Sequence, residues 1–147
     1  MLDLAEEEAQ RLGHARIGSE DLLLGILRFG YRNAQILTAL GVELEAARAA
    51  VERIAGTAAA AAAPPEALPL NARAERVIRH ALDICARMRS GYFGGDELLL
   101  GVLAEPDCTA AAALRALGLS LDEMRLVIEV AHLEARVLAY GGPEPQA

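Results

Sequence analysis

Apolar residues recur along this chain at steps of three and four, the spacing that places them on one face of an α-helix. Four segments share one order of steps: three, then four, then three. No stretch alternates between apolar and polar residues over a useful length, so we expect an all-α fold without a sheet. The four apolar faces are Leu2, Ala5, Ala9 and Leu12; Leu44, Ala47, Val51 and Ile54; Ile78, Ala81, Cys85 and Met88; and Leu121, Met124, Ile128 and Ala131.

One sequence unit occurs twice. Residues 17–27 read I-G-S-E-D-L-L-L-G-I-L, and residues 93–103 read F-G-G-D-E-L-L-L-G-V-L, at an offset of 76. The A-L-G-V of residues 39–42 returns as A-L-G-L at residues 116–119. Repetition of this kind indicates structural units that pack on each other. We therefore expect two tandem four-helix repeats packed as a pseudo-twofold helical bundle, with the leucine triplets in its core.

Capping and turn signals divide each copy into helices. Ser19 is expected to cap the second helix, and Ser120 with Glu123 forms a capping box for the last one. Gly41 and Gly118 are expected to end the third helices in a left-handed conformation. The predicted organisation is a first repeat at 1–55, an alanine- and proline-rich linker at 56–69, a second repeat at 70–139 and a disordered tail at 140–147, with both repeats in one domain.

Composition narrows the possible functions. The 147 residues carry a formal net charge of −7, and all 14 basic residues are arginine. The lack of lysine excludes Schiff-base chemistry and the lysine-containing phosphate loop of ATPases. The acidic balance disfavours nucleic-acid binding. The N-terminus lacks the features of a secretory signal, no apolar run is long enough to cross a bilayer, and two cysteines are too few for a disulfide scaffold. We therefore expect a cytoplasmic protein without membrane partners.

Two motifs carry a family resemblance. R-L-G-H-A-R-I-G-S-E at residues 11–20 and P-L-N-A-R-A at residues 69–74 resemble motifs of the two repeats in the N-terminal domain of the bacterial Clp AAA+ unfoldases, of ClpC and ClpA type. The resemblance covers residues 1–139. It implies a non-catalytic module that receives substrates or adaptors and passes them to an ATPase ring feeding a protease.

The chain also departs from this family pattern. Because it has no lysine, it has no Walker A motif, and we expect a free-standing domain without its own ATPase. Its first helix is shortened relative to the family. Leu70 stands where the family has an aromatic residue, and Asn71 where it has a threonine.

The resemblance further implies a ligand site. In some members an acidic residue grips the guanidinium of a phosphorylated arginine on the substrate, while amides at a helix N-terminus bind the phosphate. Glu20 and Asp96 occupy this acidic position in the two copies. The alternative is that both acids only complement their helix dipoles, and the shortened first helix affects the phosphate side of copy one. The residues expected at the site are Glu20, Asp96, Ser19, Asn71, Leu70 and Arg73.

The other reactive side chains favour structural roles. His14 is expected to hydrogen-bond loop backbone, and His80 and His132 lack metal-ligand spacing. Cys85 lies on an apolar face and is expected to be a buried small hydrophobe. Cys108 has no histidine near it in the sequence, so a catalytic role is disfavoured. We expect no metal and no cofactor.

These observations predict a non-enzymatic protein-binding module that acts as adaptor, regulator or decoy in regulated proteolysis. Its expected partners are protein substrates, adaptors or a Clp ATPase, and association of two chains is left open. The alternatives are a hydrolase that uses Cys108 or paired acids, an all-helical transcription regulator, and a small-molecule-binding decoy. A transcription regulator needs a basic recognition helix, whereas these arginines are scattered among acids: Arg11, Arg48, Arg76 and Arg125.

Overall fold

The computed structural model describes residues 1–30, 32–56, 67–89 and 93–139. This described part is helical and contains no strand, which confirms the all-α prediction; one isolated parallel bridge joins Ile17 to Leu70. Most of the predicted linker and the whole predicted tail lie outside the described residues. The helices are α1 (Leu2–Arg11), α2 (Ser19–Phe29), α3 (Arg32–Ala39), α4 (Leu44–Ala55), α5 (Ala72–Arg87), α6 (Gly95–Leu103), α7 (Thr109–Ala116) and α8 (Leu121–Ala139).

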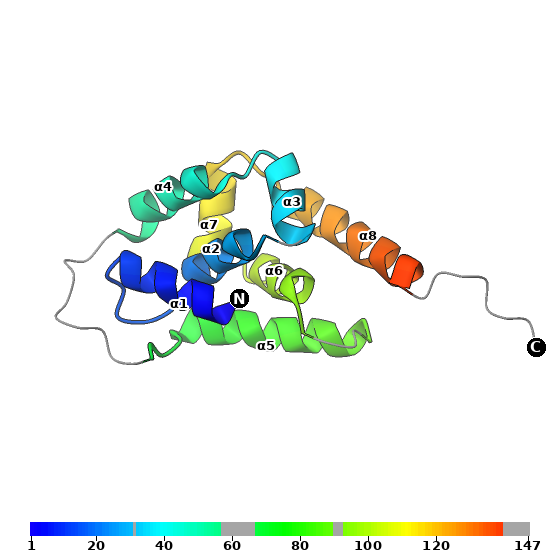
Figure 1. Cartoon of the computed structure of the whole chain (residues 1–147), viewed down its shortest axis with the longest axis horizontal. Helices are drawn as coiled ribbons and strands as arrows, with labels where there is room; N and C mark the ends of the chain where they lie inside the picture. Colours follow the sequence, from blue (N-terminus) through cyan, green and yellow to red (C-terminus); the bar gives the residue numbers. More distant parts are fainter. Residues whose placement is uncertain (31, 57–66, 90–92, 140–147) are drawn as a thin grey trace, which may run out of the picture.

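The two sequence copies form the predicted pseudo-twofold bundle, with four helices from each. α1 packs against α2 in the first copy, as α5 packs against α6 in the second. α2 and α6 meet at the centre, with α1 and α5 on one side of them and α3, α4, α7 and α8 on the other (Figure 1). The copies also interlock, since α7 packs against α2 and α4. At this contact the Ala110 N–H donates to Ser19 Oγ at 3.1 Å.

The motif L-L-L-G sets the spacing of the central helices. All six leucines of the two triplets are buried in the core. The glycine that follows each triplet allows a neighbouring backbone to approach. A Cβ on Gly25 would lie 2.9 Å from Ala5 N, and one on Gly101 would lie 2.5 Å from Val77 O. Since such contacts are shorter than van der Waals separation, glycine is required for α1 to reach α2 and for α5 to reach α6.

Several local predictions are confirmed and others are wrong. Gly41 and Gly118 have φ values of 91° and 86°, the expected left-handed conformation, and Ser120 Oγ accepts the Glu123 N–H at 3.4 Å. Ser19 does not cap α2, because Gly18 occupies the N-cap and Ser19 begins the helix. Cys85 is half-buried rather than buried, since the buried face of α5 is rotated toward a different set: Ala74, Val77 and Ala81.

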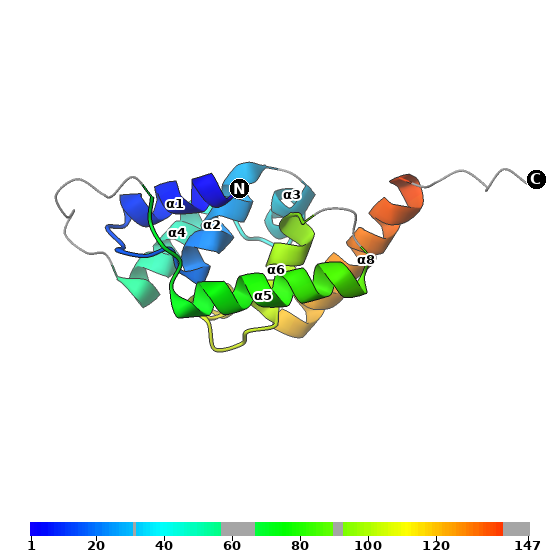
Figure 2. The same cartoon turned by 90° about the horizontal axis from the view of Figure 1, so that it is seen from below.

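The equivalent helices α4 and α8 differ between the copies. α4 has 12 residues and packs along α7 and α2. α8 has 19 residues and packs on α6, with a smaller contact to α7. Its C-terminal half projects from the bundle in both views (Figures 1 and 2). The structure therefore leaves much of α8 uncovered.

Candidate functional site

The two central helices begin with a pair of acids in their first turn. In each helix the carboxylate of the third residue caps the N-terminus by accepting a backbone N–H. The Gly18 N–H donates to Asp21 Oδ2 at 2.9 Å, and the Gly94 N–H donates to Glu97 Oε2 at 2.9 Å. The acids at the second position, Glu20 and Asp96, are each 8% exposed. Both pairs lie where the helix dipole favours negative charge.

In the first copy His14 lies against the acid pair of α2. Gly13, with φ of 73°, ends α1 and turns the chain back. His14 Nδ1 then lies 3.0 Å from Asp21 Oδ2 and 3.7 Å from Glu20 Oε1. Its other ring nitrogen, Nε2, lies 3.3 Å from Gly56 O at the end of α4. The expected bond from His14 to loop backbone is confirmed, and the ring also joins three segments of the copy.

Burial and hydrogen bonding have opposite effects on the pKa values of this cluster. Burial raises the pKa of the Asp21 carboxyl to about 6, against the opposing hydrogen bonds from the Gly18 N–H and His14. Burial lowers the pKa of His14, but the Asp21 carboxylate, together with Gly56 O and Glu20, outweighs this effect, and the net pKa lies above its usual value. Asp21 is fully buried, and its Oδ1 has no hydrogen-bond partner among the described residues.

Glycine at position 18 makes room for the second acid. A Cβ there would lie 2.4 Å from both carboxylate oxygens of Glu20. The Glu20 side chain is therefore folded back over the start of α2, toward His14, rather than extended into solvent.

In the second copy a histidine from a different element takes the same place. His132, on α8, has its Nδ1 at 3.0 Å from Asp96 Oδ2 and at 3.7 Å from Glu97 Oε1. The Asn33 amide, oriented to satisfy both groups, donates to Asp96 Oδ1 and accepts the Asp96 N–H at 3.3 Å. The sequence analysis did not foresee this contact between His132 and the acids of α6. The missed signal is its position four residues after Ile128, on the buried face of α8.

The six predicted site residues fall into two places. The bridge between Ile17 and Leu70 brings the start of α2, with Ser19 and Glu20, beside the start of α5. Asp96 lies apart from them, in the cluster with Asn33 and His132. The remaining predicted residues already have intramolecular roles: Asn71 Oδ1 caps α5 by accepting the Ala74 N–H at 2.8 Å, Arg73 donates to Asp107 O, and Leu70 packs against the core.

The alternative chemistries find little support in the described residues. Cys108 is fully buried, and its Sγ accepts the Ala111 N–H at 3.4 Å. His80 Nε2 is paired with Glu105 Oε1 at 2.8 Å. The scattered arginines lie beside acids or carbonyl groups: Arg11 and Arg48 on Glu8, Arg76 at 4.0 Å from Glu105, and Arg125 on Leu103 O.

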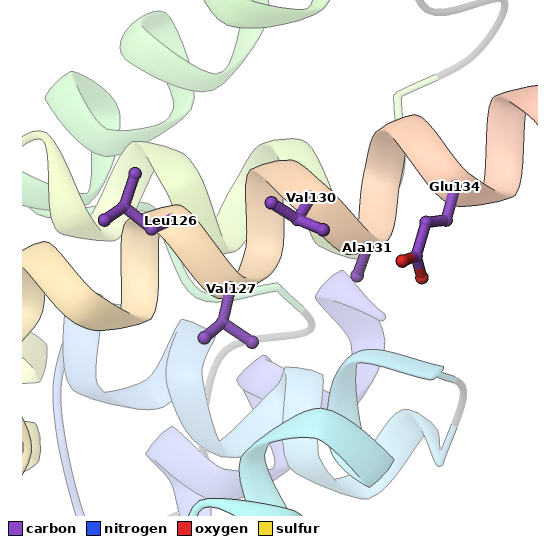
Figure 3. A pocket seen from close by; sticks show the side chains of 5 residues that line it. All are labelled: Leu126, Val127, Val130, Ala131 and Glu134. Carbon is purple, nitrogen blue, oxygen red and sulfur yellow. The ribbon is translucent and has the colours of Figure 1, made fainter.

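The outward side of α8 carries an exposed apolar stripe. Met124, Ile128 and His132 face the core at steps of four. On the opposite side, the exposed fractions of four apolar residues reach 62% for Leu126, 53% for Val130, 54% for Leu133 and 69% for Val137. An apolar pocket of about 370 Å³ adjoins the stripe and is lined by Leu126, Val127, Val130, Ala131 and Glu134 (Figure 3). Across the described helices, none combines the length and apolar character needed to span a membrane.

Comparisons with known proteins place this arrangement in a family. The chain is 38% identical over 141 residues to a ClpA homolog, an ATP-dependent Clp protease ATP-binding subunit, of Guillardia theta, covering 95% of this chain and 17% of that protein. It is 35% identical over 126 residues to the chaperone protein ClpB of Oceanobacillus iheyensis, and the match covers 85% of this chain and 15% of that protein. The chain thus spans about a sixth of the length of these relatives.

Solved structures share the fold. The N-terminal domain of the chaperone ClpD from Arabidopsis thaliana superposes with a TM-score of 0.74 at 23% identity, covering 90% of this chain and 89% of that one. The Hsp104 N-terminal domain from Candida albicans has a TM-score of 0.70 at 17% identity, and the match covers 86% of this chain and 83% of that one. A family model described as the Clp repeat (R) N-terminal domain matches residues 1–117, and the chain therefore belongs to this family.

Proposed function

We propose that this chain is a non-catalytic protein-binding module of the Clp chaperone type, which holds an apolar segment of a client or adaptor against the outward side of α8. The observation that carries the proposal is the stripe of Leu126, Val130, Leu133 and Val137. A helix that carries apolar residues on two opposite sides is typically covered by other protein on both of those sides. Contiguous exposed apolar surface marks interaction sites on soluble proteins.

The charges around the stripe favour one kind of occupant. Glu134 lines the pocket, and Glu123 is exposed on the same helix. The chain as a whole has a net charge of −7. We therefore propose that the bound apolar segment is flanked by arginine or lysine. An acidic surface attracts basic partners and disfavours acidic ones.

Membership of the family supports the finer parts of the proposal. The ATP-binding relatives carry this domain as a small part of a much longer chain, and these 147 residues contain no lysine for a phosphate loop. We propose that the domain supplies recognition in Clp-dependent proteolysis and that ATP hydrolysis takes place outside these 147 residues. A buried Cys108 and paired arginines make the hydrolase and transcription-regulator alternatives weaker.

The proposal is tested by fluorescence anisotropy with a labelled peptide that has an apolar centre and arginines at both ends. The Leu126→Asp/Val130→Asp double variant is expected to weaken binding at least about tenfold. Leu82→Asp is the matched control, because Leu82 is 52% exposed but lies on α5. The proposal would be refuted if the double variant bound the peptide as tightly as the unmodified protein, or if the control lost as much affinity as the double variant. Sedimentation of the free protein checks whether a second copy competes for the stripe.

A more specific part of the proposal is that Glu20 and Asp96 recognise phosphoarginine on the bound protein. Its support is the bidentate fit of carboxylate to guanidinium and the anion-binding amides at the starts of α2 and α6. Each acid lies beside a histidine, so a guanidinium would replace His14 or His132 there. Calorimetric titration with a phosphoarginine peptide is expected to give binding that Glu20→Ala plus Asp96→Ala removes. Binding that survives the double substitution would contradict the carboxylate grip.

A further inference from the structure

We propose that His14, Glu20 and Asp21 form a binding site for a divalent first-row transition-metal ion of the zinc type. Each residue offers one ligand atom, and the three atoms lie within 4.8 Å of one another. One imidazole nitrogen with two carboxylate oxygens is a donor set that zinc accepts in proteins, with water in the remaining position. The proposal concerns a site separate from the α8 stripe and does not depend on it. The metal site shares Glu20 with the proposed phosphoarginine site, so the metal ion and a guanidinium would compete for this carboxylate.

The surroundings of His14 fit a metal-ligating imidazole. When the Nε2–H donates to Gly56 O, at 3.3 Å, the Nδ1 lone pair faces the two carboxylates. A ligating histidine characteristically donates its second ring N–H to a backbone carbonyl or carboxylate, which fixes its tautomer and orientation. Gly56 O supplies this partner, and it does so from the end of α4.

The second observation is an unpartnered buried oxygen on one of the three residues. Asp21 is fully buried, its Oδ2 accepts from Gly18 N–H and faces His14, and its Oδ1 has no hydrogen-bond partner among the described residues. A buried polar atom without a partner is costly and calls for an explanation such as an ion. Two adjacent buried carboxylates share a single imidazole here, so a cation balances charge that the side chains alone leave uncompensated.

The second copy provides a built-in comparison. Its acid pair is also next to a histidine, but there the acid at 3.0 Å from the histidine is Asp96, the counterpart of Glu20 rather than of Asp21. The Asn33 amide donates to Asp96 Oδ1, whereas Asp21 Oδ1 has no such partner among the described residues. Across the described residues, His14, Glu20 and Asp21 form the one group of three that meets the distance requirement for a metal. Two sites of nearly the same composition thus differ in the feature that a metal would use.

The site is reachable from solvent. The side chains of His14 and Glu20 are 14% and 10% exposed, so an ion can enter and keep a water ligand. Bound there, the ion would join the loop after α1 to the start of α2, and through Gly56 to the end of α4. Its consequence is therefore a more stable first copy rather than catalysis.

The test uses the untagged full chain, freed of metal with EDTA and then titrated with zinc chloride in a calorimeter. We expect one zinc ion per chain and a melting temperature raised by about 5–10 °C at a hundredfold excess over Kd. Cobalt(II) should give a visible d–d spectrum that zinc displaces. Asp21→Asn and His14→Gln should weaken zinc binding at least about tenfold, whereas the matched variants Asp96→Asn and His132→Gln should leave the stoichiometry at one.

Three results would overturn the proposal: no zinc binding at millimolar concentration, binding unchanged by Asp21→Asn, or binding lost equally in Asp96→Asn. Circular dichroism checks that each variant folds. If Asp21→Asn does not fold, Glu20→Gln replaces it, since Glu20 reaches solvent. A Cys85→Ser background removes the half-buried thiol as a competing ligand.

Discussion

Ile17 of the first sequence copy pairs with Leu70 of the second. The Ile17 N–H donates to Pro69 O at 2.8 Å, and the Asn71 N–H donates to Ile17 O at 2.9 Å. The segment that opens α5 therefore lies against the motif that opens α2 in the other copy. Together with the packing of α7 on α2 and α4, this pairing makes each copy complete the other.

The first prediction is that neither copy folds alone. Residues 1–56 and residues 67–139, made separately, should each lack a cooperative thermal transition, because α2 would expose the surface that it buries against α6 and α7. An equimolar mixture should regain helical circular dichroism and a single transition. A cooperative transition in either isolated half, unchanged by adding the other, would contradict it.

The close approach at Gly101 leads to a second prediction. Gly101→Ala should lower the free energy of unfolding by about 1–3 kcal/mol, because the new Cβ meets the backbone of α5 and overpacks the interface. Gly25→Ala is the comparison, since its shortest contact is 2.9 Å rather than 2.5 Å. Chemical denaturation should rank Gly101→Ala as the more damaging substitution. In a helix without this contact, alanine would instead be more stable than glycine.

The fold could be predicted from the sequence because repetition and helical periodicity are local signals. The spacing of Leu44, Ala47 and Val51 marks an apolar face on which the structure buries Ala47 and Val51 and packs Leu44, partly buried, against the core. Periodicity also misled where an end of a helix projects beyond its neighbours: Leu2 and Ile54 extend predicted apolar faces but are 47% and 44% exposed.

The candidate sites could be predicted only in part. The acids Glu20 and Asp96 are visible in the repeated motif, since each lies two residues before a leucine triplet. The histidines that contact these acids are not visible in the motif, because His14 belongs to a loop and His132 to the last helix. Only tertiary packing places each histidine beside an acid pair. The unpartnered oxygen of Asp21 likewise depends on burial, which no residue spacing reports.

A buried ion pair between α1 and α4 gives the third prediction. Glu8 is fully buried and accepts from Arg48 Nη2 at 2.6 Å and from Arg11 Nε at 2.7 Å. Burial alone would raise the pKa of Glu8, but the two arginines outweigh it and hold the pKa below its usual value. Glu8→Gln should therefore cost about 2–3 kcal/mol in the free energy of unfolding.

The control for this substitution is Glu7→Gln. Glu7 pairs with Arg28 at 2.8 Å, but its side chain is 58% exposed, so its loss should cost less than about 0.5 kcal/mol. Urea denaturation at pH 7 measures both. Because the folded-state pKa of Glu8 is lowered, its stabilising effect is present above pH 4.5 and should fade as the pH falls through the folded-state pKa. Equal effects of the two variants would count against the buried pair.

The fourth prediction concerns the pH dependence set by Asp21 in protein kept free of metal by EDTA. Its folded-state pKa of about 6 lies above the ordinary 3.8, so the folded chain holds this proton more tightly than the unfolded chain does. The resulting stability is fully present below pH 3.8 and is lost as the pH rises to 6. Asp21→Asn should therefore flatten the stability profile over this window. A profile that keeps its slope in Asp21→Asn would contradict this assignment.

The fifth prediction separates the two apolar sides of α8. Ile128→Ala should destabilise the fold by about 2–5 kcal/mol, because this side chain is fully buried and leaves a cavity. Leu133→Ala should change stability by less than about 0.5 kcal/mol, because Leu133 is 54% exposed. If the outward side serves recognition, Leu133→Ala should instead weaken binding of the arginine-flanked apolar peptide while the melting temperature holds. A large stability loss at Leu133 would mean that this side already packs against another part of the protein in solution, and the stripe would then not be available to a client.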